Sequence, residues 1–391
     1  MVRGKRGVSI NIVAVLIAAL VIGIVIGYGV LQLTVKPETV TTTITKSETL
    51  TESKILTTPL PTTITETKTI TELETKTTTV TRTLKPEKKA LFDVLGRKIE
   101  LAKIPKRVVS LAPSITEILF ALGVGDRVVG VDSFSNYPPK VVELVKEGKI
   151  KVVGGYWAPD LEKVVELNPD LVIADLGAHY KYLAKFEELG LNVLFVKGGN
   201  AVNLIDIYND ILLIGEALNA TDKAYEIVTK IKEMISSISD KLAKVNVTQR
   251  KVLILLGPPT YGLWTTGSGT FIDELIRICG GINIASKYHG WIQISKEEIL
   301  VQNPDIIIVT VMGTKEDAVK VIEEIMSPEM GLDVNAVKNK EIYVLIGEAD
   351  DLLCRPGPRV AEAVKMLASI IHPEVFGEVG REDVVSAKQL S

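Results

Sequence analysis

The side chains best suited to bind a ligand in this chain of 391 residues are aromatic rings placed in loops. Aromatic residues make up only 5% of the sequence, yet all three tryptophans fall between predicted strands and helices: Trp157, Trp264 and Trp291. Tyrosines occupy the same or neighbouring loops: Tyr137, Tyr156 and Tyr261. Rings that line a cleft bind large planar or macrocyclic ligands by stacking and apolar contact. The alternative is that each ring packs beneath its own loop, but three tryptophans in matching loops favour the cleft.

One cation stands in a loop that is expected to reach the same cleft. Arg355 lies in a Pro- and Gly-rich loop, where its guanidinium is expected to bind a carboxylate, a phosphate or another acceptor on the ligand. Arg359 opens the following helix and is expected to be solvated or at the edge of the core. Polar groups at the ends of predicted strands are candidates for the rim of the cleft: Asp132, Asp175 and His179.

The sequence lacks the residue patterns that support catalysis. There are three histidines, and His179 and His289 stand in different halves without a local partner, so no metal site is expected. Neither a phosphate-binding Walker loop nor a G-x-S-x-G elbow occurs. The net charge of −3 gives no reason to expect nucleic acid as a partner. These observations predict a binding protein without a cofactor of its own, not an enzyme.

The elements that must position the rings come in a repeated pattern. Residues 107–131 and 251–286 each run from an apolar strand through a small-residue loop into an amphipathic helix and a glycine. In a second pair, residues 160–175 and 295–310, Asn-Pro-Asp leads from a helix into a buried strand. Alternating strands and helices predict parallel sheets, which bind ligands at the carboxyl ends of their strands. The repeat predicts two similar lobes that clamp a ligand, with Trp157 and Trp291 facing each other across the cleft.

The predicted fold is therefore α/β, with two doubly wound lobes joined by one long interdomain helix. Helical periodicity without strands over residues 202–248 predicts that continuous helix. The predicted strands are Val108–Leu111, Val128–Val131, Leu171–Ala174, Asn192–Val196, Val252–Leu256, Ile306–Val309 and Ile342–Leu345. The expected segments are an anchor or signal segment 1–35, a stalk 36–89, an N-terminal lobe 90–201, the helix 202–248, a C-terminal lobe 249–378 and a tail 379–391.

The N-terminal part predicts attachment to a membrane. Residues 8–35 are almost entirely apolar and long enough to span a bilayer. Basic residues precede them without an acidic one, which places the N-terminus in the cytoplasm and the rest of the chain outside. A cleaved signal peptide is the alternative, but no Ala-x-Ala site follows the apolar run. Threonine then recurs at nearly every second position from Thr39 to Thr83, which predicts a disordered stalk.

Two cysteines, Cys279 and Cys354, leave two interpretations open. Outside the cell they could form a disulfide. Alternatively, Cys279 is a core residue, because it continues the apolar helical stripe of Phe271, Leu275 and Ile278.

The chain resembles the substrate-binding proteins of ABC importers for cobalamin, ferric siderophores and haem. The resemblance rests on VVSLAPSITEILFALG from Val108, on the two Asn-Pro-Asp strand entries, and on RPGPRVAEAVKMLASIIHPEVFG from Arg355. It covers residues 92–376. It implies a bilobed fold with a rigid interdomain helix, a metal chelate as the small-molecule ligand, and ABC permease subunits in the membrane as partners.

The resemblance also implies that a surface glutamate on each lobe docks into arginine pockets of the permease. Position in the repeated pattern assigns this role to Glu117 and Glu274. A competing interpretation is that Ser114-Ile-Thr-Glu117 is a capping box, in which Glu117 bonds the cap backbone. In the second copy Thr270 begins the box, and Glu274 is left free.

Taken with the resemblance, the sequence predicts an extracytoplasmic solute-binding protein, anchored by residues 8–35, that delivers a metal chelate to an ABC permease. The aromatic cleft favours cobalamin as the ligand, and a ferric siderophore or haem is the alternative. A second alternative of another class is a cell-surface interaction protein that has the fold but does not transport.

Overall fold

The computed structural model describes residues 40–44, 63–72, 74–83 and 91–390. The chain forms two compact units, residues 1–89 and 90–391, and each is described by itself. Within the described ranges, no helix has both the length and the apolar character needed to cross a bilayer. The predicted anchor, residues 8–35, lies outside the described residues.

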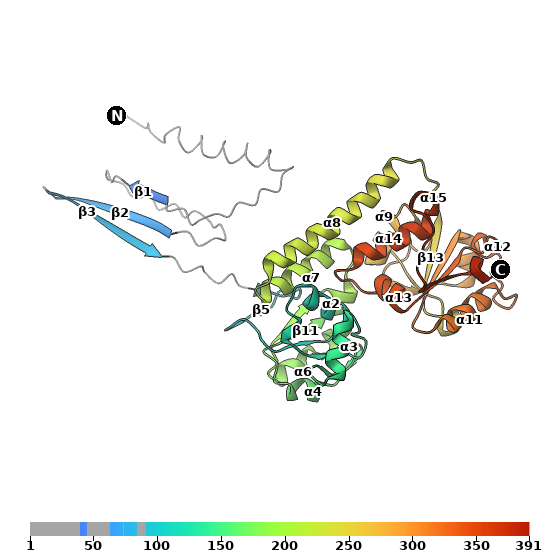
Figure 1. Cartoon of the computed structure of the whole chain (residues 1–391), viewed down its shortest axis with the longest axis horizontal. Coiled ribbons are helices and arrows are strands. Elements are labelled where there is room, and N and C mark those ends of the chain that lie inside the picture. The colour runs from blue at the N-terminus through green and yellow to red at the C-terminus, as the bar shows by residue number, and fades with distance from the viewer. Residues whose placement is uncertain (1–39, 45–62, 73, 84–90, 391) are drawn as a thin grey trace, which may run out of the picture. The chain divides into compact units, whose positions relative to one another are not determined.

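The described part of the threonine-rich tract contains strands, where the sequence predicts a disordered stalk. Strands β2 (Thr63–Glu72) and β3 (Glu74–Thr83) pair antiparallel, and β1 (Val40–Ile44) pairs parallel with β2 (Figure 1). Threonine is β-branched and favours extended backbone, and ladder hydrogen bonds form without an apolar core. The prediction considered only the missing core, and so overlooked this local preference.

After the short antiparallel pair β4 (Leu91–Phe92) and β5 (Lys98–Ile99), the second unit forms a parallel sheet of five strands in the order β12-β11-β6-β7-β8. Its strands are β6 (Val108–Ser110), β7 (Val128–Val131), β8 (Lys151–Val152), β11 (Leu171–Asp175) and β12 (Val193–Val196). All five residues of β11 are buried, as expected of a central strand covered on both faces. The four strands predicted in this half are confirmed. Strand β8 was not predicted, because its sequence is too short and too polar to be recognised as a strand.

A second sheet of five strands follows, in the order β15-β13-β17-β18-β19. Its strands are β13 (Lys251–Leu256), β15 (Ile282–Asn283), β17 (Ile306–Val311), β18 (Ile342–Ile346) and β19 (Val384–Ser386). The prediction that residues 379–391 form a tail outside the C-terminal lobe is wrong. Val384 and Val385 of this segment are buried in β19, which pairs antiparallel with β18 and is the edge strand of the sheet. Two adjacent valines are too short a run to predict a strand.

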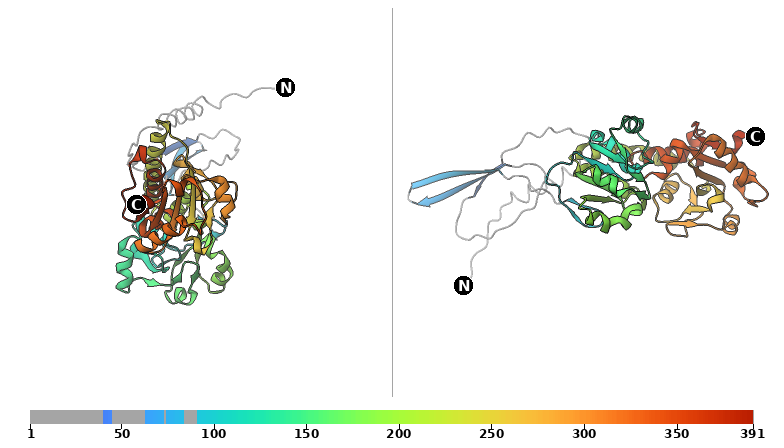
Figure 2. Two further views of the ribbon diagram at one scale, coloured as in Figure 1. Left: turned by 90° about the vertical axis from the view of Figure 1, so that its right-hand side faces the viewer. Right: turned by 90° about the horizontal axis from the view of Figure 1, so that it is seen from below.

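Helices cover both faces of each sheet. On β6, Val108 belongs to the apolar cluster that contains α2 (Pro113–Ala121), whereas Val109 packs in the cluster of α4 (Leu161–Glu166) and α6 (Leu183–Glu188). The helices of the second sheet are α9 (Phe271–Ile278), α10 (Lys296–Gln302), α11 (Lys315–Met326), α12 (Asn335–Lys338), α13 (Gly347–Cys354) and α14 (Val360–Ile371). We call β4 (Leu91–Phe92) to β12 the N-terminal group and β13 onwards the C-terminal group; they lie side by side in Figure 2.

The helical segment between the groups is two helices, so the prediction of one continuous helix is wrong. Helix α7 (Leu204–Ala217) ends at Leu218, and α8 (Thr221–Ala243) packs back against it. The chain reverses at Asn219, which has a positive φ of 56°. Gly215 permits the close approach, because a Cβ there would lie 2.5 Å from the Cβ of Ala224. The sequence does not reveal this break, because the residues that flank the turn are compatible with a continuous helix.

One apolar cluster runs through both groups by way of α8. Its members include Val108 beneath α2, Ile231 and Ile238 on α8, and Val252 and Val364 in the C-terminal group. Figure 1 shows α8 extending from the helices of the first sheet towards those of the second. Because interiors of this kind are close-packed, α8 ties the two sheets together.

Candidate functional site

A cavity of about 990 Å³ opens where loops at the carboxyl ends of strands from both sheets meet. The N-terminal group contributes residues after β6, β7, β11 and β12, and the C-terminal group contributes residues after β13, β17 and β18. The cavity therefore lies where ligands bind in doubly wound sheets, as the sequence predicted. Its volume is at the upper end of the range for small-molecule pockets, which suits a large ligand.

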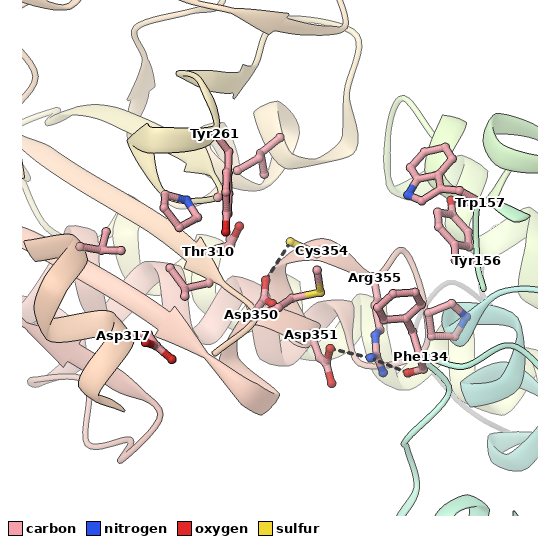
Figure 3. A pocket seen from close by; sticks show the side chains of 18 of the residues that line it. Phe134, Tyr156, Trp157, Tyr261, Thr310, Asp317, Asp350, Asp351, Cys354 and Arg355 are labelled. Carbon is pink, nitrogen blue, oxygen red and sulfur yellow. Dashed lines mark hydrogen bonds and ion pairs between the residues drawn. The ribbon is translucent and has the colours of Figure 1, made fainter. Parts of the chain in front are cut away.

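Aromatic rings stand on two sides of this cavity (Figure 3). Tyr156 and Trp157, between the short strands β9 (Gly154–Gly155) and β10 (Ala158–Pro159), pack edge to face with ring centroids 4.7 Å apart. Tyr261, after β13, stands on the opposite side. Trp157 is 61% exposed and Tyr261 is 77% exposed, so both rings are open to a ligand.

Buried polar groups behind Tyr156 fix the position of this aromatic pair. The Tyr156 hydroxyl donates a hydrogen bond to Asp175 at 2.9 Å, and Asp175 also accepts from the backbone of Gly199 at 2.7 Å. His179 is fully buried; its Nδ1 accepts from the backbone N–H of Asp175, and its Nε2 lies 2.6 Å from the Tyr156 carbonyl oxygen. Burial lowers the pKa of His179. A neutral ring with its proton on Nε2 satisfies both hydrogen bonds.

Arg355 lines the cavity, but its two terminal nitrogens are already bound within the protein. Nη1 donates to Glu117 at 2.9 Å and to Asn136 at 2.8 Å. Nη2 donates to the Phe134 carbonyl at 3.1 Å and lies 2.5 Å from Asp351. These bonds join the C-terminal group to the loop after β7, and they leave the terminal nitrogens little capacity for an anionic ligand.

Glu117 is the centre of a buried ion cluster between the two groups. It is 3% exposed, and Arg359 holds it with two hydrogen bonds, from Nε at 2.8 Å and from Nη2 at 2.7 Å. The capping-box interpretation of Glu117 is wrong, because α2 begins after Ala112 without a side-chain cap. The expected surface position for permease docking is not observed either, because this carboxylate faces two guanidinium groups of its own chain.

Residues 108–349 match the family of periplasmic binding proteins. The chain belongs to this family. An uncharacterized ABC transporter substrate-binding lipoprotein of Bacillus subtilis, YvrC, is 34% identical over 290 residues, which are 73% of this chain and 86% of that protein. A vitamin B12-binding protein of Photorhabdus laumondii is 28% identical over 270 residues, 68% of this chain and 88% of that protein.

A solved structure with the same fold is the periplasmic heme-binding protein RhuT from Roseiflexus, in apo form. It aligns with a TM-score of 0.59 and 26% identity, and covers 69% of this chain and 99% of that chain. The prediction that this chain is a binding protein and not an enzyme is confirmed by its family.

Other predicted site residues of this periplasmic binding protein lie outside the cavity lining. Trp264 and Trp291 belong to a two-stranded antiparallel sheet, β14 (Trp264–Thr266) and β16 (Trp291–Gln293), and the Trp291 ring packs on Phe271. Tyr137 covers the guanidinium of Arg359, with 3.7 Å between the ring centroid and the guanidinium carbon. The residue opposite Trp157 is therefore Tyr261, not Trp291. The β14–β16 pairing that places Trp291 outside the cavity joins residues far apart in sequence, so no local pattern predicts it.

The second docking candidate, Glu274, lies in the first turn of α9. Thr270 caps α9 as predicted, and Glu274 is half-buried, with its carboxylate accepting a hydrogen bond from the Leu204 backbone N–H at 2.5 Å.

Cys279 and Cys354 are both free thiols. The core interpretation of Cys279 is confirmed, because this residue is fully buried, whereas Cys354 lies in the cavity wall.

Sequence reasoning missed the polar residues that line the C-terminal wall of the cavity. These are Thr310, Asp317, Lys320, Glu324, Asp350, Asp351 and Cys354. Some follow β17 and β18 directly, so their position after a buried strand was a usable signal. Others lie on α11, whose pattern of charges resembles that of any solvated helix.

Proposed function

We propose that the chain is the extracytoplasmic substrate-binding protein of an ABC importer and that its cargo is cobalamin. The observation that carries the proposal is the cavity of about 990 Å³ with exposed rings on both sides. Rings placed in this way stack on a large macrocycle. The vitamin B12-binding relative, which is covered over 88% of its length, supports this cargo.

The alternative cargo is haem or a ferric siderophore. The likeness to the heme-binding structure supports haem, since a porphyrin also stacks between aromatic rings. Cobalamin is favoured because Arg355, which could have bound the carboxylates of an anionic chelate, is engaged by Glu117 and Asp351.

In the proposed mechanism the N-terminal and C-terminal groups act as two lobes joined by α7 and α8. The cargo enters between Trp157 and Tyr261, and the loaded protein then binds the permease. Glu274 remains a candidate for that docking, because it is half-buried, and its partner is a backbone N–H, not a guanidinium. Residues 8–35 are proposed to anchor the chain, with the threonine-rich tract as the spacer.

Tryptophan fluorescence titrations of the full-length chain in detergent test the proposal, with cyanocobalamin, hemin and ferric siderophores as ligands. Absorption by each ligand must be corrected for. Saturable quenching by cyanocobalamin at about 1 μM or tighter is expected. Trp157→Ala should weaken binding, whereas Trp291→Ala is the matched control because this ring lies outside the cavity lining. Absence of saturable binding by every ligand would overturn the transport proposal and favour the surface interaction protein.

A further inference from the structure

The charged residues that line the cavity are mostly acidic. Five carboxylates and two cations contribute to the lining: Asp175, Asp317, Lys320, Glu324, Asp350, Asp351 and Arg355. Both cations are paired within the protein, Lys320 with Asp317 at 3.1 Å and Arg355 with Glu117 and Asp351. Among the described residues, the lining therefore offers an excess of carboxylates and no unpaired cation.

Asp350 is the carboxylate in this wall that lacks strong protein donors. It is 7% exposed, and one of its oxygens accepts a hydrogen bond from the Cys354 thiol at 3.3 Å. No other hydrogen bond or ion pair reaches this side chain from the residues that the structure describes. A thiol is a weak donor, and a buried carboxylate normally has strong ones. In Figure 3 Asp350 lies in the cavity wall between Thr310 and Arg355.

Glu324 adds a second carboxylate to the same wall. It lies on α11, and its side chain has no hydrogen bond or ion pair with the described part of the protein. Asp317, about two turns earlier on this helix, differs because it is held by Thr314 and Lys320. Asp175 on the opposite side is also satisfied, by Tyr156 and backbone N–H groups. Asp350 and Glu324 are thus the lining carboxylates that lack strong hydrogen-bond donors within the described part of the protein.

We propose that Asp350, supported by Glu324, selects the cargo by accepting hydrogen bonds from N–H donors and by repelling carboxylates. This inference rests on the proposed function and specifies the class of cargo, which is a neutral or cationic macrocycle fringed with amides. The amide N–H groups supply the donors that the wall lacks, and a chelate with carboxylates at this position meets like charge. The pKa of Asp350 is raised to about 6, chiefly by burial, so the group is mostly ionised at neutral pH.

The test compares cyanocobalamin with corrins that differ from it by one charge, using the full-length chain in detergent and equilibrium dialysis. The ligands are cyanocobalamin and its monocarboxylic acid derivatives, in each of which one peripheral amide is hydrolysed to a carboxylate. At least one derivative is expected to bind about tenfold more weakly than cyanocobalamin. In Asp350→Asn that discrimination should fall severalfold, because the amide no longer repels the carboxylate.

Glu324→Gln is the second variant, and Glu323→Gln is its control, because Glu323 is exposed on the same helix and does not line the cavity. Circular dichroism shows whether each variant folds. If the wild type binds cyanocobalamin and all the derivatives equally, charge selection is wrong while the cobalamin proposal stands. Discrimination that survives in both Asp350→Asn and Glu324→Gln also overturns it. If no corrin binds, the proposed function itself fails.

Discussion

Arg359 binds the Glu117 carboxylate with two hydrogen bonds, from Nε and Nη2, although 242 residues separate these residues in the sequence. Arg355 bonds the same carboxylate from the cavity side. The ion cluster thereby connects the cavity wall to α2 in the N-terminal group. Removing one member of a buried cluster leaves the others without compensation, so this connection is expected to control both stability and the relation of the two groups.

The first prediction concerns the carboxylate of this cluster. Glu117→Gln should lower the free energy of unfolding by about 3–5 kcal/mol, because two guanidinium groups lose their shared anion. Chemical denaturation measures the loss, and small-angle scattering should show a larger radius of gyration as the groups separate. Glu362→Gln on exposed α14 surface is the control. A Glu117→Gln protein as stable as this control would show that the cluster contributes nothing.

The second prediction concerns the support of the aromatic pair. His179→Leu leaves the Tyr156 carbonyl and the Asp175 backbone N–H without partners, at about 1–3 kcal/mol each. Cyanocobalamin should bind more weakly, because the loop that carries Trp157 loses its anchor. Isothermal titration calorimetry gives the affinity, and His289→Leu, at an exposed position, is the control. Unchanged affinity in a folded His179→Leu protein would contradict the positioning role.

The third prediction concerns pH. Asp210 is buried beneath the turn at Lys197 and Gly198, and burial raises its pKa from 3.8 to about 7 although both backbone N–H groups lower it. Between about pH 4 and 7 the folded chain keeps a proton that the unfolded chain has released, so stability falls as pH rises. Asp210→Asn should reduce this fall, which is on the order of a few kcal/mol, in denaturation curves at several pH values. An equally steep fall in the variant would assign the proton to another group.

The fourth prediction concerns the thiols. Iodoacetamide at alkaline pH should label Cys354 but not native Cys279, which is fully buried with its Sγ 3.3 Å from the Val364 carbonyl oxygen. Cys354 is an exposed residue, but desolvation of its Sγ and the carboxylate of Asp350, 3.3 Å away, raise the pKa of the thiol, so labelling should be slow near neutral pH. Cyanocobalamin should slow it further, because Cys354 lines the cavity. Mass spectrometry that finds the two cysteines joined would contradict the free thiols.

The sequence allowed the buried strands to be predicted because they are short apolar runs with clear boundaries. Asn168 and Asn303 each have a positive φ and end a helix directly before β11 and β17, which is why the Asn-Pro-Asp repeat marked both strands. The turn at Asn219 was missed, since a single asparagine between two good helix formers does not reveal that the chain reverses.

The site was only partly predictable from the sequence. Tyr156 and Trp157 were found because aromatic residues are few in this chain and these two stand together in a predicted loop between a strand and a helix. The partner of Glu117 could not be found, because a side-chain pair over 242 residues leaves no local pattern. Trp291 was assigned to the cavity by analogy with Trp157, and β14–β16 pairing places it elsewhere. Loop conformation, unlike strand position, depends on such tertiary pairs.

The central claim is that cobalamin binds between Trp157 and Tyr261. The most direct test is a crystal structure of the protein with cyanocobalamin, using the anomalous scattering of cobalt to locate the metal. We predict one strong cobalt peak inside the cavity, with the corrin ring against Trp157 and its amides towards Asp350. A cobalt peak elsewhere on the protein, or a cavity that stays empty at saturating cyanocobalamin, would contradict the account.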